Sequence, residues 1–236
     1  MKLLKLRAGR VDERTATTLN NLAAVYFSEG LYDRAERLYI KAFDLYRKNL
    51  PEDHPYLIVV RNNLAVLYLD KGDLERAASF SSSSGELESW PLRALQLNNR
   101  AAIEAGKTNY DAASSLLARA VALHEGNGDR QSAAYASILN NIGAVQFRQG
   151  LYELAEQSYL KALSLRLERL ASGHPDVGQS YYNLAKLTIR LGRLEEASAY
   201  LAKSLHIRLA CFGSDHQKVR DCKDLERSLR TMLALR

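Results

Sequence analysis

Apolar residues recur at helical spacing along most of the chain. In the segment 19–46 they stand three or four places apart, at Leu22, Ala23, Tyr26, Tyr39 and Ala42. This spacing places them on one face of a helix, which is buried against a neighbouring helix. Gly30 lies between the two halves of the segment, and glycine readily adopts the left-handed conformation that ends helices. The pattern therefore predicts two helices that pack as a pair.

Two adjacent asparagines interrupt the apolar face of the first helix, and the pair returns along the chain. Its second member falls at Asn21, Asn63, Asn99, Asn141 and Asn183, at intervals of 42, 36, 42 and 42 residues. Nine of the twelve asparagines lie in this frame. An interior Asn costs up to about 0.7 kcal/mol relative to Ala, so nine would cost about 6 kcal/mol, comparable with a domain's net stability. A cost of this size indicates a role for the pair.

Other residues keep the same period, which is typical of a solenoid of stacked helix pairs. Glycines recur at the predicted end of the first helix, at Gly30, Gly72, Gly150 and Gly192. Alanines recur where the two helices of a pair would cross, at Ala35, Ala77, Ala113, Ala155 and Ala197. We predict that each asparagine pair lies on the first helix of its repeat, over residues 15–29, 55–71, 91–106, 133–149 and 175–191.

Histidine-containing linkers connect successive units. They read "PEDHPYL", "ASGHPDV" and "GSDHQKV" and contain His54, His174 and His216. A proline follows the first two histidines, in a first helical turn where a missing N–H does no harm. We therefore interpret the histidines as helix-start residues. Metal binding is disfavoured, because equivalent positions of a solenoid stand well apart.

Two longer stretches, "LNNLAAVYFSEGLYDRAERLYIKAF" and "HPDVGQSYYNLAKLTIRLGRLEEASAYLAKSL", together with these linkers resemble the tetratricopeptide repeat family. The resemblance covers residues 12–236 and is to the 42-residue variety found in kinesin light chains. It implies an all-α fold, a right-handed α-solenoid of helix-turn-helix repeats. It also implies that the first helices line a concave groove that binds peptide segments of other proteins.

This register predicts the organisation of the chain. Residues 1–11 are expected to be a partial preceding helix or cap, 12–90 the first two repeats, 91–215 repeats three to five, and 216–236 a capping helix with a polar outer face.

The 36-residue interval marks an irregular junction over residues 81–91. Ser81 and Ser84 stand where other repeats have an aromatic residue and an alanine, and serines weaken a helix. Arg100 and Glu104 occupy positions that are apolar core elsewhere. One interpretation is a rotated helix with a solvent-facing ion pair, and the other is a hinge or docking surface.

Composition narrows the choice of function. The hydrophobic share of 47%, the charged share of 25% and the absence of a long uncharged run predict a globular protein with no membrane insertion, and the charged start predicts a cytoplasmic location. Two cysteines are too few for a metal cage, and no cofactor motif is present. A net charge of +6 favours an acidic partner, either a peptide or a nucleic acid.

The candidate site residues follow from the resemblance. It places the second asparagine of each pair where family members hydrogen-bond a peptide backbone, so Asn21, Asn63, Asn99, Asn141 and Asn183 are candidate peptide ligands. The alternative is that these amides only bridge adjacent repeats, since buried amides usually find partners within the protein. Near one end, Lys186, Arg148 and Arg190 are expected to make the groove basic.

We therefore expect a non-enzymatic interaction scaffold that binds an extended, acidic peptide segment. No convergent nucleophile and base, phosphate loop or metal set points to an enzyme. The alternative is a nucleic-acid-binding repeat protein with a basic surface, which is disfavoured because acidic residues are interspersed and stacking aromatics do not recur in every repeat. The oligomeric state does not follow from the sequence.

Overall fold

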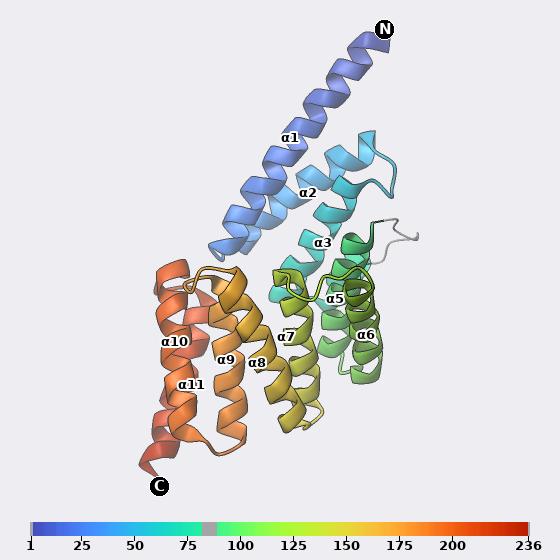
Figure 1. Ribbon diagram of the computed structural model, residues 1–236. Coiled ribbons are helices and arrows are strands. Elements are labelled where there is room, and N and C mark those ends of the chain that lie inside the picture. Colours follow the sequence, from blue (N-terminus) through green and yellow to red (C-terminus); the bar gives the residue numbers. More distant parts are fainter. Residues whose placement is uncertain (1, 82–88, 236) are drawn as a thin grey trace. The chain divides into compact units, whose positions relative to one another are not determined.

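The computed structural model describes residues 2–81 and 89–235, and within these ranges the regular structure is entirely helical (Figure 1). The eleven helices there are α1 (Lys2–Ser28), α2 (Tyr32–Asn49), α3 (Pro55–Asp70), α4 (Leu74–Ser81), α5 (Trp90–Gly106), α6 (Tyr110–Gly126), α7 (Ala133–Arg148), α8 (Tyr152–Arg169), α9 (Pro175–Arg190), α10 (Leu194–Phe212) and α11 (Gln217–Ala234). The predicted all-α class is confirmed.

The chain forms two compact units, which we describe separately. Unit 1 is Met1–Asn109 and contains α1 to α5, and unit 2 is Tyr110–Arg236 and contains α6 to α11. The boundary falls between the two helices of the third repeat. Most of the irregular junction, including Ser84 and Gly85, lies outside the described residues.

The asparagine frame lies on the first helix of each repeat, as predicted. The observed bounds of α3, α5, α7 and α9 differ from the predicted ones by one residue at most. Helix α1 instead begins at Lys2, so residues 2–11 continue the first helix without a turn. This segment is rich in Lys, Leu and Arg, which favour helix, and holds no proline to end it.

Left-handed residues end the first helices. Gly30, Gly72, Gly150 and Gly192 have φ between 75° and 79°, as their spacing predicts. The third repeat places Thr108 at the equivalent position, with φ of 66°. A β-branched residue is strained in this conformation, so the turn after α5 is the least favourable of the five.

Histidines cap the helices that follow the linkers. The Nδ1 atoms of His54, His174 and His216 accept a hydrogen bond from the backbone N–H two residues later, at 3.2, 3.1 and 3.0 Å. Each bond satisfies an N–H that the first turn leaves without a partner. The predicted role of the three histidines is confirmed.

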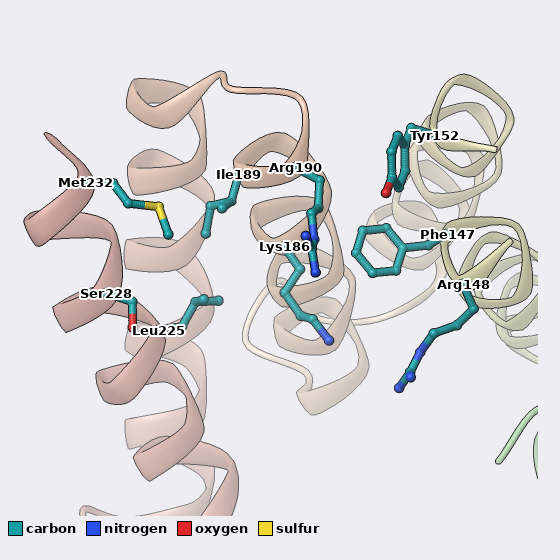
Figure 2. A pocket seen from close by; sticks show the side chains of 9 residues that line it. All are labelled: Phe147, Arg148, Tyr152, Lys186, Ile189, Arg190, Leu225, Ser228 and Met232. Carbon is teal, nitrogen blue, oxygen red and sulfur yellow. The ribbon is translucent and has the colours of Figure 1, made fainter. Parts of the chain in front are cut away.

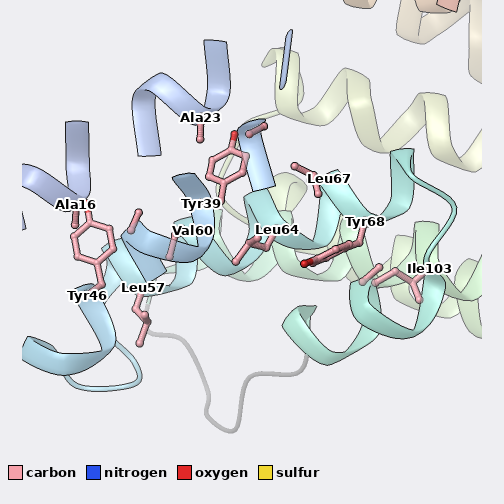
Figure 3. Packing of buried hydrophobic residues seen from close by; sticks show 13 residues of the cluster. Ala16, Ala23, Tyr39, Tyr46, Leu57, Val60, Leu64, Leu67, Tyr68 and Ile103 are labelled. Carbon is pink, nitrogen blue, oxygen red and sulfur yellow. The ribbon is translucent and has the colours of Figure 1, made fainter. Parts of the chain in front are cut away.

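The repeat core is built on small residues at helix crossings. Ala35, Ala77, Ala113, Ala155 and Ala197 are all fully buried. In unit 1, Tyr39 and Tyr46 of α2 lie against Ala23 and Ala16 of α1 (Figure 3). The predicted burial of Leu22 is wrong, because this side chain is 42% exposed while the equivalent Leu64 is fully buried. In the described chain, no helix pair lies before α1 to cover it.

The third repeat departs from the pattern at two core positions. Arg100 is exposed, and the carboxylate of Glu104 accepts a hydrogen bond of 2.8 Å from the side-chain amide of Asn109. The equivalent Leu64 and Tyr68 are buried in the preceding repeat. The solvent-facing orientation of Arg100 agrees with a locally altered helix surface.

Candidate functional site: an asparagine ladder and a basic pocket

The asparagine pairs form a ladder between adjacent repeats. In three places the second asparagine of a repeat donates from Nδ2 to Oδ1 of the first asparagine one repeat earlier. The bonds are Asn63 to Asn20 at 2.9 Å, Asn99 to Asn62 at 3.4 Å and Asn183 to Asn140 at 2.9 Å. Of the two roles that the sequence left open, the bridging role is therefore present for Asn63, Asn99 and Asn183.

Two further second asparagines each contact the first asparagine of their own pair. Asn21 is exposed, and its Oδ1 lies 3.4 Å from Nδ2 of Asn20. Asn141 is half-buried, and its Oδ1 lies 3.5 Å from Nδ2 of Asn140. A side-chain amide has two N–H donors, so a bridge between repeats uses one of them. A binding role for the second asparagines is compatible with the ladder and stays a prediction.

The three basic residues predicted near one end of the groove come together in unit 2. Arg148 ends α7, while Lys186 and Arg190 lie one turn apart on α9. They line a pocket of about 790 Å³ whose other lining residues are Phe147, Tyr152, Ile189, Leu225, Ser228 and Met232. Figure 2 shows Lys186 and Arg190 directed from α9 toward α7, with the α11 side chains on the opposite side. We call this site the basic pocket.

The Lys186 ammonium is held in a partly desolvated position. Its Nζ lies 5.8 Å from the centroid of the Phe147 ring and 5.8 Å from that of Tyr182. Burial lowers the pKa of Lys186, and the positive charges of Arg148 and Arg190 lower it further. Asp221 acts in the opposite direction. Among the described residues, no carboxylate forms an ion pair with any of these three cations, so the basic pocket is suited to an external anion.

The register of the repeats explains why the basic pocket lies at α9. Lys186 follows the second asparagine of its repeat by three residues, where the four earlier repeats have Ala24, Val66, Ala102 and Ala144. Only the last of these first helices thus places a cation at this position. Leu225, Ser228 and Met232 come from α11, which the sequence predicted only as a cap, so their part in the pocket was missed.

Two buried arginines were also missed. Nη1 of Arg166 donates to the backbone oxygen of Asp176 at 2.9 Å, and Nη1 of Arg208 donates to that of Lys218 at 2.7 Å. Arg208 also lies over the Tyr182 ring, 4.3 Å from its centroid. Both arginines tie the end of a second helix to the first turn of the next repeat. Their spacing of 42 residues was the available signal.

Other kinds of site are absent from the part of the chain that the structure describes. No helix there is both long and apolar enough to cross a membrane. No group of three or more His, Cys, Asp or Glu side chains is arranged there to hold a metal ion. The two cysteines are free thiols, with Cys211 exposed and Cys222 buried.

Comparison with known proteins places this architecture in a family. The tetratricopeptide repeat matches residues 14–82, 92–168 and 134–210, which is most of the chain. The chain is 25% identical over 199 residues to Protein KINESIN LIGHT CHAIN-RELATED 1 of Arabidopsis thaliana. The match includes 84% of this chain but only 26% of that relative, so the chain spans about a quarter of its length.

Solved structures show the same fold. BtubC (BKLC) from P. vanneervenii has a TM-score of 0.57 at 23% identity, with 86% of this chain and 91% of that chain covered. A putative kinesin light chain with nearly identical TPR-like repeats from Podosopora anserina has a TM-score of 0.55 at 19% identity, with 84% and 96% covered. The chain therefore belongs to the tetratricopeptide repeat family, and its repeats are of the kinesin-light-chain-like type.

Proposed function

We propose that the chain is a non-enzymatic scaffold that captures an acidic segment of a partner protein at the basic pocket. Tetratricopeptide repeats typically mediate protein–protein interaction, and the pocket indicates the chemistry of the ligand. The observation that carries the proposal is the environment of Lys186. Its charge is partly desolvated and lies among like charges, which is unfavourable in the free protein. A carboxylate of the partner would offset this cost.

The other cations of the chain support an acidic peptide over a nucleic acid. Lys71 pairs with Glu36 at 2.6 Å, and Arg193 pairs with Glu156 at 2.6 Å. These two cations are thus neutralised within the protein and are less available to phosphates than the unpaired cations of the basic pocket. The basic pocket also has an apolar wall of Ile189, Leu225 and Met232, which suits the side chains of a peptide.

The asparagine ladder would hold the backbone of the same segment. Asn141 and Asn183 lie on α7 and α9, the helices that carry the three cations. Asn183 uses one of its two N–H donors in the bridge to Asn140, which leaves the other for a partner. We extend the proposal to Asn21, Asn63 and Asn99, which occupy the equivalent position in unit 1. Hydrogen bonds to the backbone of the bound peptide do not depend on the peptide's side chains. Selectivity would therefore come from Arg148, Lys186 and Arg190.

A salt titration tests this function against the nucleic-acid alternative. Fluorescence anisotropy would follow binding of a labelled Glu-rich peptide, a Gln-for-Glu peptide of the same length, and a random RNA. The proposal predicts saturable binding of the acidic peptide, weakened by salt, and at least about tenfold weaker binding of the Gln peptide. Preferential binding of RNA, with a steep salt dependence, would favour the alternative.

A further inference from the structure

A chain of side-chain hydrogen bonds runs from α10 through α9 to α7 within unit 2. Nη2 of Arg208 donates to Oε1 of Gln179 at 2.9 Å. Nε2 of Gln179 donates to Oδ1 of Asn183 at 2.9 Å, and Nδ2 of Asn183 donates to Oδ1 of Asn140 at 2.9 Å. These three bonds, which we call the amide relay, connect a buried cation to the asparagine ladder.

Arg208 fixes the direction of the amide relay. A guanidinium can only donate, so the group of Gln179 that faces it must be the oxygen. The nitrogen of Gln179 then faces Asn183, and a half-turn of the Asn183 amide would set its N–H groups against those of Gln179. Arg208 itself is held firmly, because it is 2% exposed and its Nη1 donates to the backbone oxygen of Lys218 at 2.7 Å. The orientation of the Asn183 amide is therefore fixed.

The relay depends on a residue that distinguishes the last repeat. Gln179 precedes the second asparagine by four residues, about one helical turn. Ser137 of the preceding repeat meets Nη2 of Arg166 at 3.3 Å, as Gln179 meets Arg208. The one hydrogen of the Ser137 hydroxyl, however, goes to the backbone oxygen of Ala133 at 3.0 Å. The residues at this position in the four earlier repeats are Thr17, Val59, Leu95 and Ser137, none of which has a side-chain amide.

The fixed amide lies on the same face of α9 as two cations of the basic pocket. Lys186 and Arg190 follow Asn183 by three and seven residues, a spacing that places all three on one side of a helix. Figure 2 shows both cations directed from α9 toward α7. Lysine and arginine side chains have no acceptor, and the second N–H of Asn183 is not used by the relay. This face therefore presents hydrogen-bond donors to a ligand.

We infer that Gln179, anchored by Arg208, is a positioning residue that holds Asn183 as a hydrogen-bond donor to the segment captured at the basic pocket. The atom that Asn183 binds is then an oxygen, either a backbone carbonyl or a carboxylate. An asparagine that could turn over would accept from a peptide N–H equally well, and the relay removes that choice. This inference rests on the proposed function and adds the kind of atom bound and the residue that orients its donor.

The test replaces Gln179 with the residue that the preceding repeat has at this position. Gln179→Ser keeps a hydroxyl near Arg208, as Ser137 has near Arg166, but removes the amide that donates to Asn183. The matched control is Gln157→Ser, which changes an exposed amide of α8. One measurement needs no ligand, namely hydrogen exchange of the Asn183 side-chain amide protons followed by NMR. The other is the affinity for a labelled Glu-rich peptide, measured by fluorescence anisotropy with and without Asn183→Ala.

The Asn183 amide protons are expected to exchange about threefold faster or more in Gln179→Ser than in the wild type. Peptide binding should weaken about threefold for Gln179→Ser and for Asn183→Ala, and the double variant should bind no more weakly than Asn183→Ala. The Gln157→Ser control should match the wild type in both measurements. A purely structural role of Gln179 would instead leave the Asn183 amide unchanged, since the serine still meets Arg208.

Unchanged exchange of the Asn183 amide in Gln179→Ser would overturn the inference. Peptide affinity that is unaffected by Asn183→Ala, or a further loss when Gln179→Ser is added to it, would overturn it as well. A wild-type chain that does not bind the peptide would overturn the proposed function and the ligand assigned to Asn183. The exchange measurement would still decide whether Gln179 holds the amide, so the two failures are distinguishable.

Discussion

The side-chain amide of Asn183 donates a hydrogen bond of 2.9 Å to the side-chain carbonyl oxygen of Asn140, one repeat earlier. Asn140 is 7% exposed, so Asn183→Ala leaves a buried acceptor without this donor. Leaving this acceptor without its donor costs about 1–3 kcal/mol. The higher helix propensity of Ala offsets up to about 0.7 kcal/mol of this cost. Asn183→Ala is expected to lower the free energy of unfolding by about 0.5–2 kcal/mol, as measured by urea denaturation.

The control for this variant is Gln157→Ala, which removes an exposed amide from α8. It should leave the free energy of unfolding nearly unchanged. Equal stability of the two variants would contradict a structural role for the ladder.

Thr108 offers a test of backbone strain. It has φ of 66° at the position where the other four repeats have glycine. The left-handed conformation costs a non-glycine residue about 1–2 kcal/mol. Glycine avoids this cost, but its greater conformational freedom in the unfolded chain cancels part of the gain in stability. Thr108→Gly is therefore expected to raise the free energy of unfolding by about 0.5–1 kcal/mol, and Gly150→Thr to lower it by at least as much. Thermal melts of both variants check this, and a lower melting temperature for Thr108→Gly would contradict the strain.

Two buried serines should respond in opposite ways to the same substitution. Ser81 stands where other repeats have a buried tyrosine or leucine, and its Oγ has no hydrogen-bond partner among the described residues. Ser204 donates from Oγ to the backbone oxygen of Gly178 at 2.8 Å. Ser81→Ala should therefore hold or raise stability by up to about 1 kcal/mol, while Ser204→Ala should lower it by about 1 kcal/mol. Parallel chemical denaturation distinguishes them, and a loss in both would show that Ser81 is paired.

The ion pairs of Lys71 should make unit 1 sensitive to acid. Burial raises the pKa of Glu36, but hydrogen bonds from Lys71 and Tyr68 outweigh it and hold the pKa below 4.5. The hydrogen bond from Lys71 also lowers the pKa of Asp33. A carboxyl with a lowered pKa stabilises the fold above its unfolded pKa, and this contribution is lost as pH falls through the folded pKa.

Lys71→Met removes the partner that both carboxylates share. We expect the variant to be less stable at neutral pH and to lose less stability than the wild type on acidification. Melting temperatures between about pH 3 and pH 7 measure this difference. Parallel curves for the two proteins would show that Lys71 does not set the pKa values.

Features that depend on local chemistry within one repeat could be predicted from the sequence. His54 caps a helix through its own turn, and Gly72 ends one through its own backbone, so the spacing was enough to identify both roles. Leu22 was predicted wrongly because its burial depends on a neighbouring helix pair and not on the helix that carries it. The burial of Leu64 was predicted correctly because the preceding repeat supplies that neighbouring helix pair.

The buried arginines and part of the basic pocket could not be predicted for the same reason, because they depend on packing between repeats. Arg166 was missed because a cation near the end of a helix is usually solvated, and because its Nη1 donates to Asp176 and Ser180, which belong to the next repeat. Arg148 and Lys186 were found through their register on successive first helices. Met232 was not, because its contact with the pocket requires the packing of α11 beside α9.

The basic pocket is the centre of the functional account, and Lys186 tests it most directly. Lys186→Met removes a partly desolvated cation that lies beside Arg148 and Arg190, so the melting temperature is expected to hold or rise. The control Lys161→Met removes an exposed cation from α8 of the same unit.

The decisive measurement is the binding isotherm of a Glu-rich peptide for the wild type and these two variants at low salt. The account predicts about tenfold or greater weakening for Lys186→Met, with no loss of thermal stability, and wild-type affinity for Lys161→Met. Equal affinity of all three proteins would contradict the assignment of the basic pocket as the peptide site.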